Sequence, residues 1–421
     1  MKENEMLLVE TMIEGYNQRI AHRQKRGGLK SMAYFYEIQK KFYENILHAR
    51  RDGKNIAWCG LFVPLELMHA MDIVPFIPES FATAAGAGVE RYMDLGEGYG
   101  IPNYACSPHR VAMGMAREGV VPSPDFMIST AQTCDSTVKI FDLLSNHYKC
   151  PTFFMDRPYS HDTEEAIAYY ADEIRSLIAF LEDQTGRKLN YERLQETIQL
   201  SKVAYDYWHQ IGQFRKNIPS PLAARDAFRD RGVMLTAVGL PESVTYFEDR
   251  YREILELVEN KQGGIAEEKC RIIWLYAPPF HDLKIMDWMA EEHGAAIVMD
   301  TFNALAESEG TDTDDPVEYL ARASYRGYLA RTSYGDMAAG GTVRDVVRMC
   351  KDYQADGVIF FAHFACKQYC GMLRLYADGI REEAGIPTLT LDGDLLDPRV
   401  VSGAQMRNRL NEFFQVLATQ C

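Results

Sequence analysis

Four of the nine cysteines stand where a predicted strand ends or a predicted helix begins. Cys59, Cys134 and Cys366 follow predicted strands, and Cys106 directly precedes a predicted helix. A thiolate near a helix N-terminus is stabilised by the helix dipole and the free N–H groups, which suits a metal ligand. Because ligands of open α/β sheets bind at the carboxyl ends of the strands, the four thiols could converge on one metal or redox site. They could also be small buried side chains, as free cysteines often are.

The spacing of the cysteines does not favour zinc. Zinc sites usually contain C-x2-C pairs, whereas the one close pair in this chain is Cys366 and Cys370, and no second pair accompanies it. We expect the four remaining cysteines to be structural, because cysteine is so often simply buried. These are Cys150, Cys270, Cys350 and Cys421.

The elements that must position these thiols alternate between strand and helix signals. The apolar run from Gly357 to Ala365 predicts a strand buried on both faces, with Cys366 at its end. Such alternation implies parallel sheets, so we expect an α/β fold of two parallel-sheet domains, Rossmann-like or flavodoxin-like, separated by a helical block. The expected divisions are a helical lead-in over 1–52, a first α/β domain over 53–160, a helical block over 161–264 and a second α/β domain over 265–421.

The composition is that of an ordinary globular protein. Of the 421 residues, 25% are charged and 47% are hydrophobic, and the length suggests two or three domains. The net charge of -15 argues against a nucleic-acid partner, which requires clustered Lys and Arg. The N-terminus lacks the apolar core of a signal peptide and no long apolar run occurs, so we expect a cytoplasmic protein without a membrane span. Scattered cysteines in that reducing compartment are poor disulfide candidates.

Three motifs around the thiols resemble the 2-hydroxyacyl-CoA dehydratase and benzoyl-CoA reductase superfamily. They are Cys106-Ser-Pro-His-Arg, Thr-Cys134-Asp-Ser and His-Phe-Ala-Cys366-Lys-Gln, and they are similar to the family in order and spacing. Two further segments add to the resemblance, which extends from about residue 54 to the end. These segments are Pro64-Leu-Glu66-Leu and Gly385-Ile-Pro-Thr-Leu-Thr-Leu-Asp392-Gly-Asp394-Leu-Leu-Asp397-Pro-Arg399.

By this resemblance, Cys106, Cys134 and Cys366 would bind a 4Fe-4S cluster. Three thiolates on a four-iron cube leave one iron without a protein ligand, and that position could accept water or substrate. Members of the family remove water from 2-hydroxyacyl-CoA thioesters through a ketyl radical, after an ATP-hydrolysing iron-sulfur activator protein delivers one electron. The resemblance therefore implies an acyl-CoA thioester as substrate, that activator as a partner, and a second homologous subunit or an identical copy.

Two polar groups near the predicted cleft are candidate catalytic residues. Glu66, at the start of a predicted helix, and His363, just before Cys366, could bind the thioester oxygen or move protons. Each could instead be a hydrogen-bonded structural group. The helix start at Gly340-Gly341-Thr342 could bind an anion such as a CoA phosphate, or could be an ordinary capped helix.

Cys59 and Cys370 leave the subtype open, because they could be inert, replace a ligand, or hold a second cube. The expected function is the iron-sulfur subunit of a radical 2-hydroxyacyl-CoA dehydratase. The alternative is an ATP-dependent reductase of the same superfamily, either of the benzoyl-CoA reductase type or with a double-cubane 8Fe cluster. An alternative of another class is a two-lobed small-molecule binding protein without a cluster.

Overall fold

The structure is a computed structural model that describes residues 4–86, 88–131, 134–158, 163–304, 313–324 and 341–419. Its first sheet contains β1 (Ile56–Cys59), β2 (Val74–Phe76), β3 (Phe126–Thr130) and β4 (Thr152–Met155) in the order β2-β1-β3-β4. The second sheet contains β5 (Cys270–Leu275), β6 (Ala295–Asp300), β7 (Gly357–His363) and β8 (Thr388–Gly393) in the order β6-β5-β7-β8.

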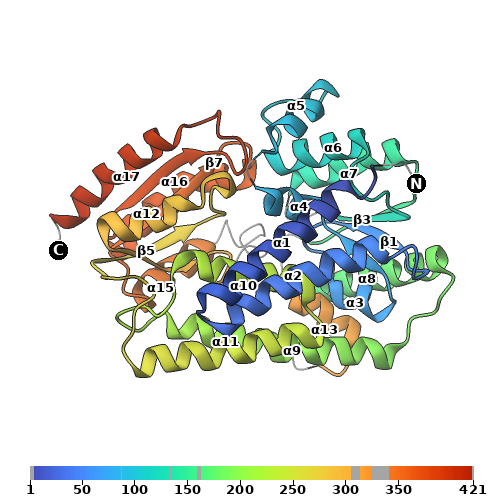
Figure 1. Cartoon of the computed structure of the whole chain (residues 1–421), viewed down its shortest axis with the longest axis horizontal. Coiled ribbons are helices and arrows are strands. Elements are labelled where there is room, and N and C mark those ends of the chain that lie inside the picture. The colour runs from blue at the N-terminus through green and yellow to red at the C-terminus, as the bar shows by residue number, and fades with distance from the viewer. Residues whose placement is uncertain are drawn as a thin grey trace.

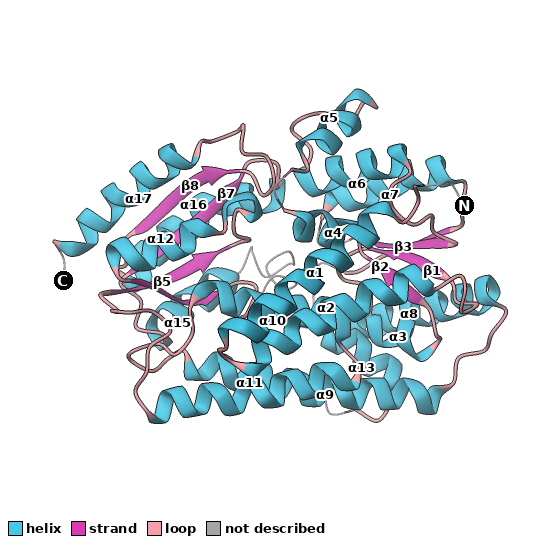
Figure 2. Cartoon of the chain, in the orientation of Figure 1, coloured by secondary structure: helices cyan, strands magenta, loops and turns pink. Residues whose placement is uncertain are grey.

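Every pair of neighbouring strands in the two sheets is parallel. The expected α/β fold with two parallel sheets is therefore confirmed, and both sheets share the flavodoxin-like strand order. In that order the connection reverses direction between the first and third strands, so each sheet has a crevice at the carboxyl ends of those two strands. Figure 2 shows the two sheets on opposite sides of the molecule.

We call the two sheets with their flanking helices the first lobe and the second lobe. The first lobe contains α3 (Leu65–Ala70), α4 (Pro78–Ala85), α5 (Glu90–Gly98), α6 (Ser107–Glu118) and α7 (Asp135–Tyr148). The second lobe contains the short 3-10 helix η1 (Phe280–Asp282), α12 (Lys284–His293), α15 (Gly341–Asp352), α16 (Lys367–Ala384) and α17 (Gly403–Ala418).

The remaining helices form a base that connects the lobes. They are α1 (Leu7–Arg26), α2 (Lys30–His48), α8 (Glu164–Thr185), α9 (Tyr191–Phe214), α10 (Ala224–Ala237), α11 (Pro241–Glu259) and α13 (Pro316–Ala323). Figure 1 shows α9 and α11 running along one side of the molecule, beneath both lobes. In the part of the chain that the structure describes, no helix is long and apolar enough to cross a membrane.

Charged contacts attach this base to both lobes. At the end of α9, Arg215 pairs with Asp300 at the end of β6, with 3.2 Å between Nη1 and Oδ2, and both side chains are buried. Helix α13 lies between β6 and β7 in sequence, but it packs against α8 and α9. There Arg157 donates from Nη2 to the carbonyl oxygen of Ser324 at 2.9 Å. The relative position of the lobes is thus set partly by helices outside both sheets.

The predicted element boundaries around Cys59 and Cys370 are wrong. The sequence places Cys59 in the loop after a strand, but it is the last residue of β1 and is fully buried. The sequence also places Cys370 in a loop before a helix beginning at Met372. Helix α16 instead begins at Lys367, which places Cys370 in its first turn.

Helices α5 and α6 touch through glycines. A Cβ atom added to Gly96 would lie 2.3 Å from the carbonyl oxygen of Arg110, and one added to Gly114 would lie 1.9 Å from that of Tyr92. Both distances are far below van der Waals contact, so only glycine allows this approach. The contact fixes α6, the helix that begins next to Cys106.

We predict that Gly96→Ala destabilises the protein by roughly 1–3 kcal/mol or more, because the added methyl group must push two backbones apart. Gly98→Ala in the same helix is the matched control, since its Cβ would meet no atom within 4 Å. The control should change the free energy of unfolding by less than about 1 kcal/mol, the size of the helix-propensity difference. Urea unfolding followed by circular dichroism measures both changes, and equal midpoints for the two variants would contradict the close helix contact.

Candidate functional site

Three of the flagged thiols occupy the same local position in three different helices. Cys106 is the N-cap residue of α6, Cys134 that of α7 and Cys366 that of α16. Cys134 follows β3 and Cys366 follows β7, the third strand of each sheet, at the crevice where ligands of such sheets bind. Free N–H groups at these helix starts can stabilise negative charge on sulfur.

The three thiols lie within electrostatic reach of one another. Burial raises the pKa of Cys106 well above its ordinary value, and the nearby charges of Cys134 and Cys366 raise it further. Burial likewise raises the pKa of Cys134 to about 11, although hydrogen bonds from Thr137 and Ser136 lower it. Three thiolates in one buried place repel each other unless a cation lies between them. The arrangement therefore suits a positively charged metal centre.

Tyr276 adds a hydroxyl group to the thiols. It directly follows β5, is buried, and hydrogen-bonds Cys366, which lowers the pKa of that thiol against the larger effect of burial. Its backbone φ of 76° lies in the left-handed region that a tyrosine rarely adopts. Such an outlier often marks a functional position. Tyr276 is not among the site residues predicted from the sequence, although its place at the end of a central strand is a usable signal.

His363 lies behind Cys106 and is completely buried. Its Nε2 atom is 3.4 Å from Sγ of Cys106, and its Nδ1 atom is 3.4 Å from Oδ2 of Asp394. The ring stacks on Tyr276 with 6.1 Å between centroids. Burial lowers its pKa to about 4, although Asp394 opposes this shift, so the ring is neutral at pH 7. We name Cys106, Cys134, Cys366, Tyr276 and His363 together the thiol site.

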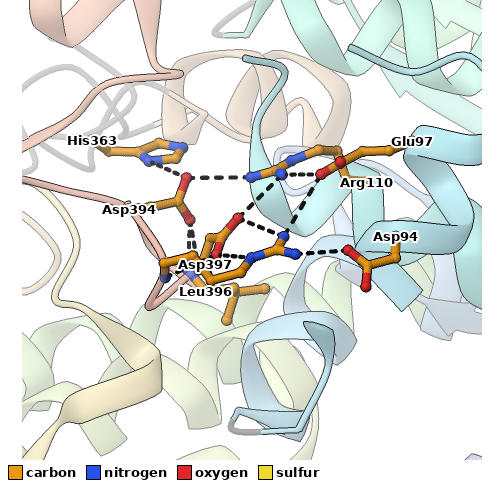
Figure 3. A network of polar contacts seen from close by, with 8 residues as sticks. Asp94, Glu97, Arg110, His363, Asp394, Leu396 and Asp397 are labelled. Carbon is orange, nitrogen blue, oxygen red and sulfur yellow. Dashed lines mark hydrogen bonds and ion pairs between the residues drawn. The ribbon is translucent and has the colours of Figure 1, made fainter. Parts of the chain in front are cut away.

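A buried ion network joins the two lobes beside the thiol site. Arg110 of α6 lies 3.6 Å from Oδ2 of Asp394 and 3.3 Å from Oδ2 of Asp397, and both aspartates follow β8. Asp394 also accepts backbone N–H groups of Leu396 and Asp397, each at 2.9 Å. Figure 3 shows Asp394 between His363 and Arg110, so the network reaches Cys106 through the histidine.

A second arginine completes the network from the surface. Arg399 bonds Asp397 and reaches Asp94 of α5 at 2.7 Å. Glu97, also in α5, pairs with Arg110. Side chains of opposite charge from the two lobes therefore meet across this contact. Arg110 and Asp394 lie within the sequence motifs but are not among the site residues predicted from the sequence.

Glu66 is hydrogen-bonded to helix α9 of the base. Its Oε1 atom accepts a hydrogen bond from the Ser201 hydroxyl at 2.8 Å, and its backbone carbonyl accepts one from Thr197 at 3.2 Å. It lines a cavity of about 110 Å³ that also contacts Arg231 and Thr301. The structure thus separates the two candidate catalytic residues, with His363 against Cys106 and Glu66 in a neighbouring cavity.

The two extra thiols have ordinary protein surroundings. Cys59 lies in the hydrophobic core, and burial raises its pKa. Cys370 donates a hydrogen bond from Sγ to the backbone oxygen of His363 at 3.1 Å, and its charge affects Cys366. The helix start that could bind an anion is only partly described. Gly340 lies outside the described residues, and so does the side chain of Thr342.

Across the described ranges, no group of three or more His, Cys, Asp or Glu side chains is placed to hold a single metal ion. This does not conflict with a cluster, because ligands that bind three different irons lie farther apart than ligands of one ion. The convergent thiols, the helix N-termini and the mutual electrostatic effects fit an iron-sulfur cube better than zinc.

This chain is similar to known proteins over most of its length. The family described as 2-hydroxyglutaryl-CoA dehydratase, D-component, matches residues 60–417. The chain is 24% identical to the (R)-phenyllactyl-CoA dehydratase alpha subunit of Clostridium sporogenes, over 93% of this chain and 96% of that protein. It is 25% identical to the lactoyl-CoA dehydratase subunit alpha of Anaerotignum propionicum, over 93% and 97%. It is also 25% identical to one of the subunits of benzoyl-CoA reductase from Thauera aromatica, over 89% and 91%.

We predict that Arg110→Met destabilises the protein by roughly 3–5 kcal/mol, because it leaves the buried carboxylate of Asp394 without a cation and that of Asp397 with Arg399 alone. Arg399→Met is the matched control within the same network, since the Arg399 side chain is 47% exposed. Its loss should cost less than about 1 kcal/mol. Urea unfolding of the protein, prepared identically for both variants, measures the difference. Equal losses of unfolding free energy in the two variants would show that the buried contact stabilises the protein no more than the exposed one.

Proposed function

Because the chain belongs to the 2-hydroxyglutaryl-CoA dehydratase, D-component family, we propose that it is the iron-sulfur subunit of a 2-hydroxyacyl-CoA dehydratase. The observation that carries this proposal is the convergence of Cys106, Cys134 and Cys366, each at a helix N-terminus and within electrostatic reach of the others. The relatives named as dehydratase alpha subunits support the same activity.

These three thiolates would hold a 4Fe-4S cluster. When bound, such a cluster would supply one-electron reduction and an iron with an open coordination position. The reaction needs this reduction because the hydrogen to be removed lies on the non-acidic β carbon. The added electron makes loss of the 2-hydroxyl group feasible.

The chain's own residues orient the thiolates and exclude water. Tyr276 hydrogen-bonds Cys366. One ring nitrogen of His363 contacts Cys106, and the other contacts Asp394. Hydrogen bonds to ligand sulfurs are one way in which a protein sets the reduction potential of a cluster. Both rings are buried, so they also keep solvent away from two of the three sulfurs.

Glu66 is the carboxylate that we propose to hold or return protons during the elimination. The Ser201 hydroxyl fixes its Oε1 atom, and the cavity beside it is large enough for part of a substrate. A carboxylate at the edge of a cavity can exchange protons with a bound acyl chain.

The electron would come from a separate ATP-hydrolysing iron-sulfur activator. The chain has no G-x-x-x-x-G-K-[ST] phosphate-binding loop, which motivates this part of the proposal. The named relatives are subunits, which supports assembly with a second homologous subunit or with an identical copy. Turnover of an acyl-CoA by this protein alone, with ATP and a mild reductant, would rule out the need for an activator.

The similarity to a benzoyl-CoA reductase subunit is the observation that supports a reductase as the second candidate. A reductase with a double-cubane cluster needs about six cysteine ligands and about eight irons, by ligand counting. Cys59 lies in the apolar core, and Cys370 already bonds the His363 carbonyl. Neither position supports a second cube, so we favour one cube and the dehydratase.

We predict that Cys106→Ser, Cys134→Ser and Cys366→Ser each lose the cluster, because serine keeps the size of cysteine but not its soft thiolate. Cys370→Ser and Cys150→Ser are the matched controls and should keep about four irons per chain, as ligand counting for one cube requires. Iron and sulfide analysis of anaerobically purified protein measures this.

Two outcomes would contradict the assignment. A colourless protein without iron in every preparation would favour a cofactor-free binding protein. About eight irons in the parent, falling to about four in a Cys59→Ser and Cys370→Ser double variant, would favour the double-cubane reductase by the same ligand counting.

A further inference from the structure

A threonine hydroxyl contacts Cys134, the one thiol of the site for which no neighbouring side chain has yet been given a role. Cys134 is the N-cap residue of α7, and Thr137 is the third residue of that helix. The first turn of a helix brings the side chains of these two positions together, as in a capping box. The Thr137 hydroxyl hydrogen-bonds Cys134 and lowers the pKa of that thiol, against the larger effect of burial.

The surroundings of Thr137 fix the direction of its side chain. The residue is buried, and its methyl group lies against Gly60, where an added Cβ atom would be 3.5 Å from Cγ2 of Thr137. The hydroxyl group must then occupy another of the staggered positions on Cβ. There its Oγ1 atom lies 3.5 Å from Nε2 of His109.

His109 contacts Thr137 and Glu79 through the same nitrogen. Its Nε2 atom is 3.2 Å from Oε1 of Glu79, and all three side chains are buried. Glu79 belongs to α4, His109 to α6 and Thr137 to α7, so three helices of the first lobe meet at this point. His109 lies in the sequence motif of Cys106, yet neither it nor Glu79 is among the site residues predicted from the sequence.

The chemistry of these groups assigns their hydrogens. A carboxylate accepts hydrogen bonds and donates none, so Nε2 of His109 carries the hydrogen that faces Glu79. The same N–H group faces the Thr137 oxygen, which therefore accepts on that side. The hydroxyl hydrogen of Thr137 cannot point at an N–H group, and it turns to the sulfur of Cys134 instead. His109 and Glu79 thus hold the hydroxyl as a donor to sulfur.

We propose that the Thr137 hydroxyl raises the reduction potential of the cluster through Cys134, and that His109 is the positioning residue that keeps the hydroxyl hydrogen on sulfur. The inference rests on the proposed iron-sulfur function, because it requires a cluster at Cys134. Reduction adds negative charge to a cluster, and a hydrogen bond donated to a ligand sulfur stabilises that charge. The reduced cluster is therefore more stable with this donor than without it.

Redox titration of the anaerobically purified full chain, followed by electron paramagnetic resonance, tests the hydroxyl. Thr137→Val keeps the shape but removes the donor. At a fixed potential we expect the ratio of reduced to oxidised cluster to fall about tenfold, the size of one hydrogen bond to a charged group. That change is about 59 mV for a one-electron couple. Thr137→Ser keeps the hydroxyl and should keep the parent potential.

Thr236→Val is the matched control. Thr236 has a buried hydroxyl in α10 that accepts a hydrogen bond from Gln39 at 2.9 Å, so it belongs to the base and not to the thiol site. Its loss should leave the reduction potential unchanged.

A double-mutant cycle tests the role of His109. His109→Asn keeps a polar side chain but is too short to reach Thr137. We expect it to lower the potential of the parent by more than that of the Thr137→Val variant, where the hydroxyl to be positioned is absent. Equal shifts in the two backgrounds would contradict a positioning role for His109.

Each remaining outcome overturns the inference. An unchanged potential in Thr137→Val, with about four irons per chain by ligand counting, would leave the dehydratase proposal intact. Loss of iron from Thr137→Val but not from Thr137→Ser would show that the hydroxyl serves the assembly of the cluster and not its potential. A parent protein without a cluster would overturn the proposed function together with this inference.

Discussion

The buried contact of Arg110 with Asp394 and Asp397 is the interaction on which the thiol site depends. Arg110 lies one turn into the helix that begins at Cys106, and the two aspartates follow the strand beside β7. Burying a guanidinium is costly unless carboxylates meet it in good geometry. The lobes can therefore approach in one arrangement, and this arrangement brings Cys106 of the first lobe to His363 of the second.

The two similar sheets explain why a site forms between the lobes at all. Each sheet has its crevice at the carboxyl ends of its first and third strands, and the lobes turn these crevices towards one another. The first lobe supplies Cys106 and Cys134, and the second supplies Cys366 and Tyr276. Because two of the ligand sulfurs belong to the first lobe and one to the second, the proposed cluster is sensitive to any movement between the lobes. The buried network and the base helices restrict that movement.

Much of this arrangement could be predicted from local sequence. Buried strands such as β7 have no polar residue before their end, so Cys134 and Cys366 could be placed after strands. Pro108 marks the helix start after Cys106. The start of α16 was misplaced because its N-cap is a cysteine instead of the Ser, Thr, Asp or Asn that usually marks such a position.

Contacts between the lobes could not be predicted in this way. Arg110 meets Asp397 across 287 residues of sequence, and no local pattern encodes such a pair. The family resemblance pointed to the cysteines but not to these supporting charges.

The central claim is that three cysteines from the two lobes hold one cube with one iron free of protein ligands. Mössbauer spectroscopy of the anaerobically isolated protein tests it most directly, before and after addition of a 2-hydroxyacyl-CoA. We predict a four-iron cluster in which one iron differs from the others and changes when the thioester is added. Equivalent irons that do not respond to the thioester, or iron bound outside a cluster, would contradict the claim.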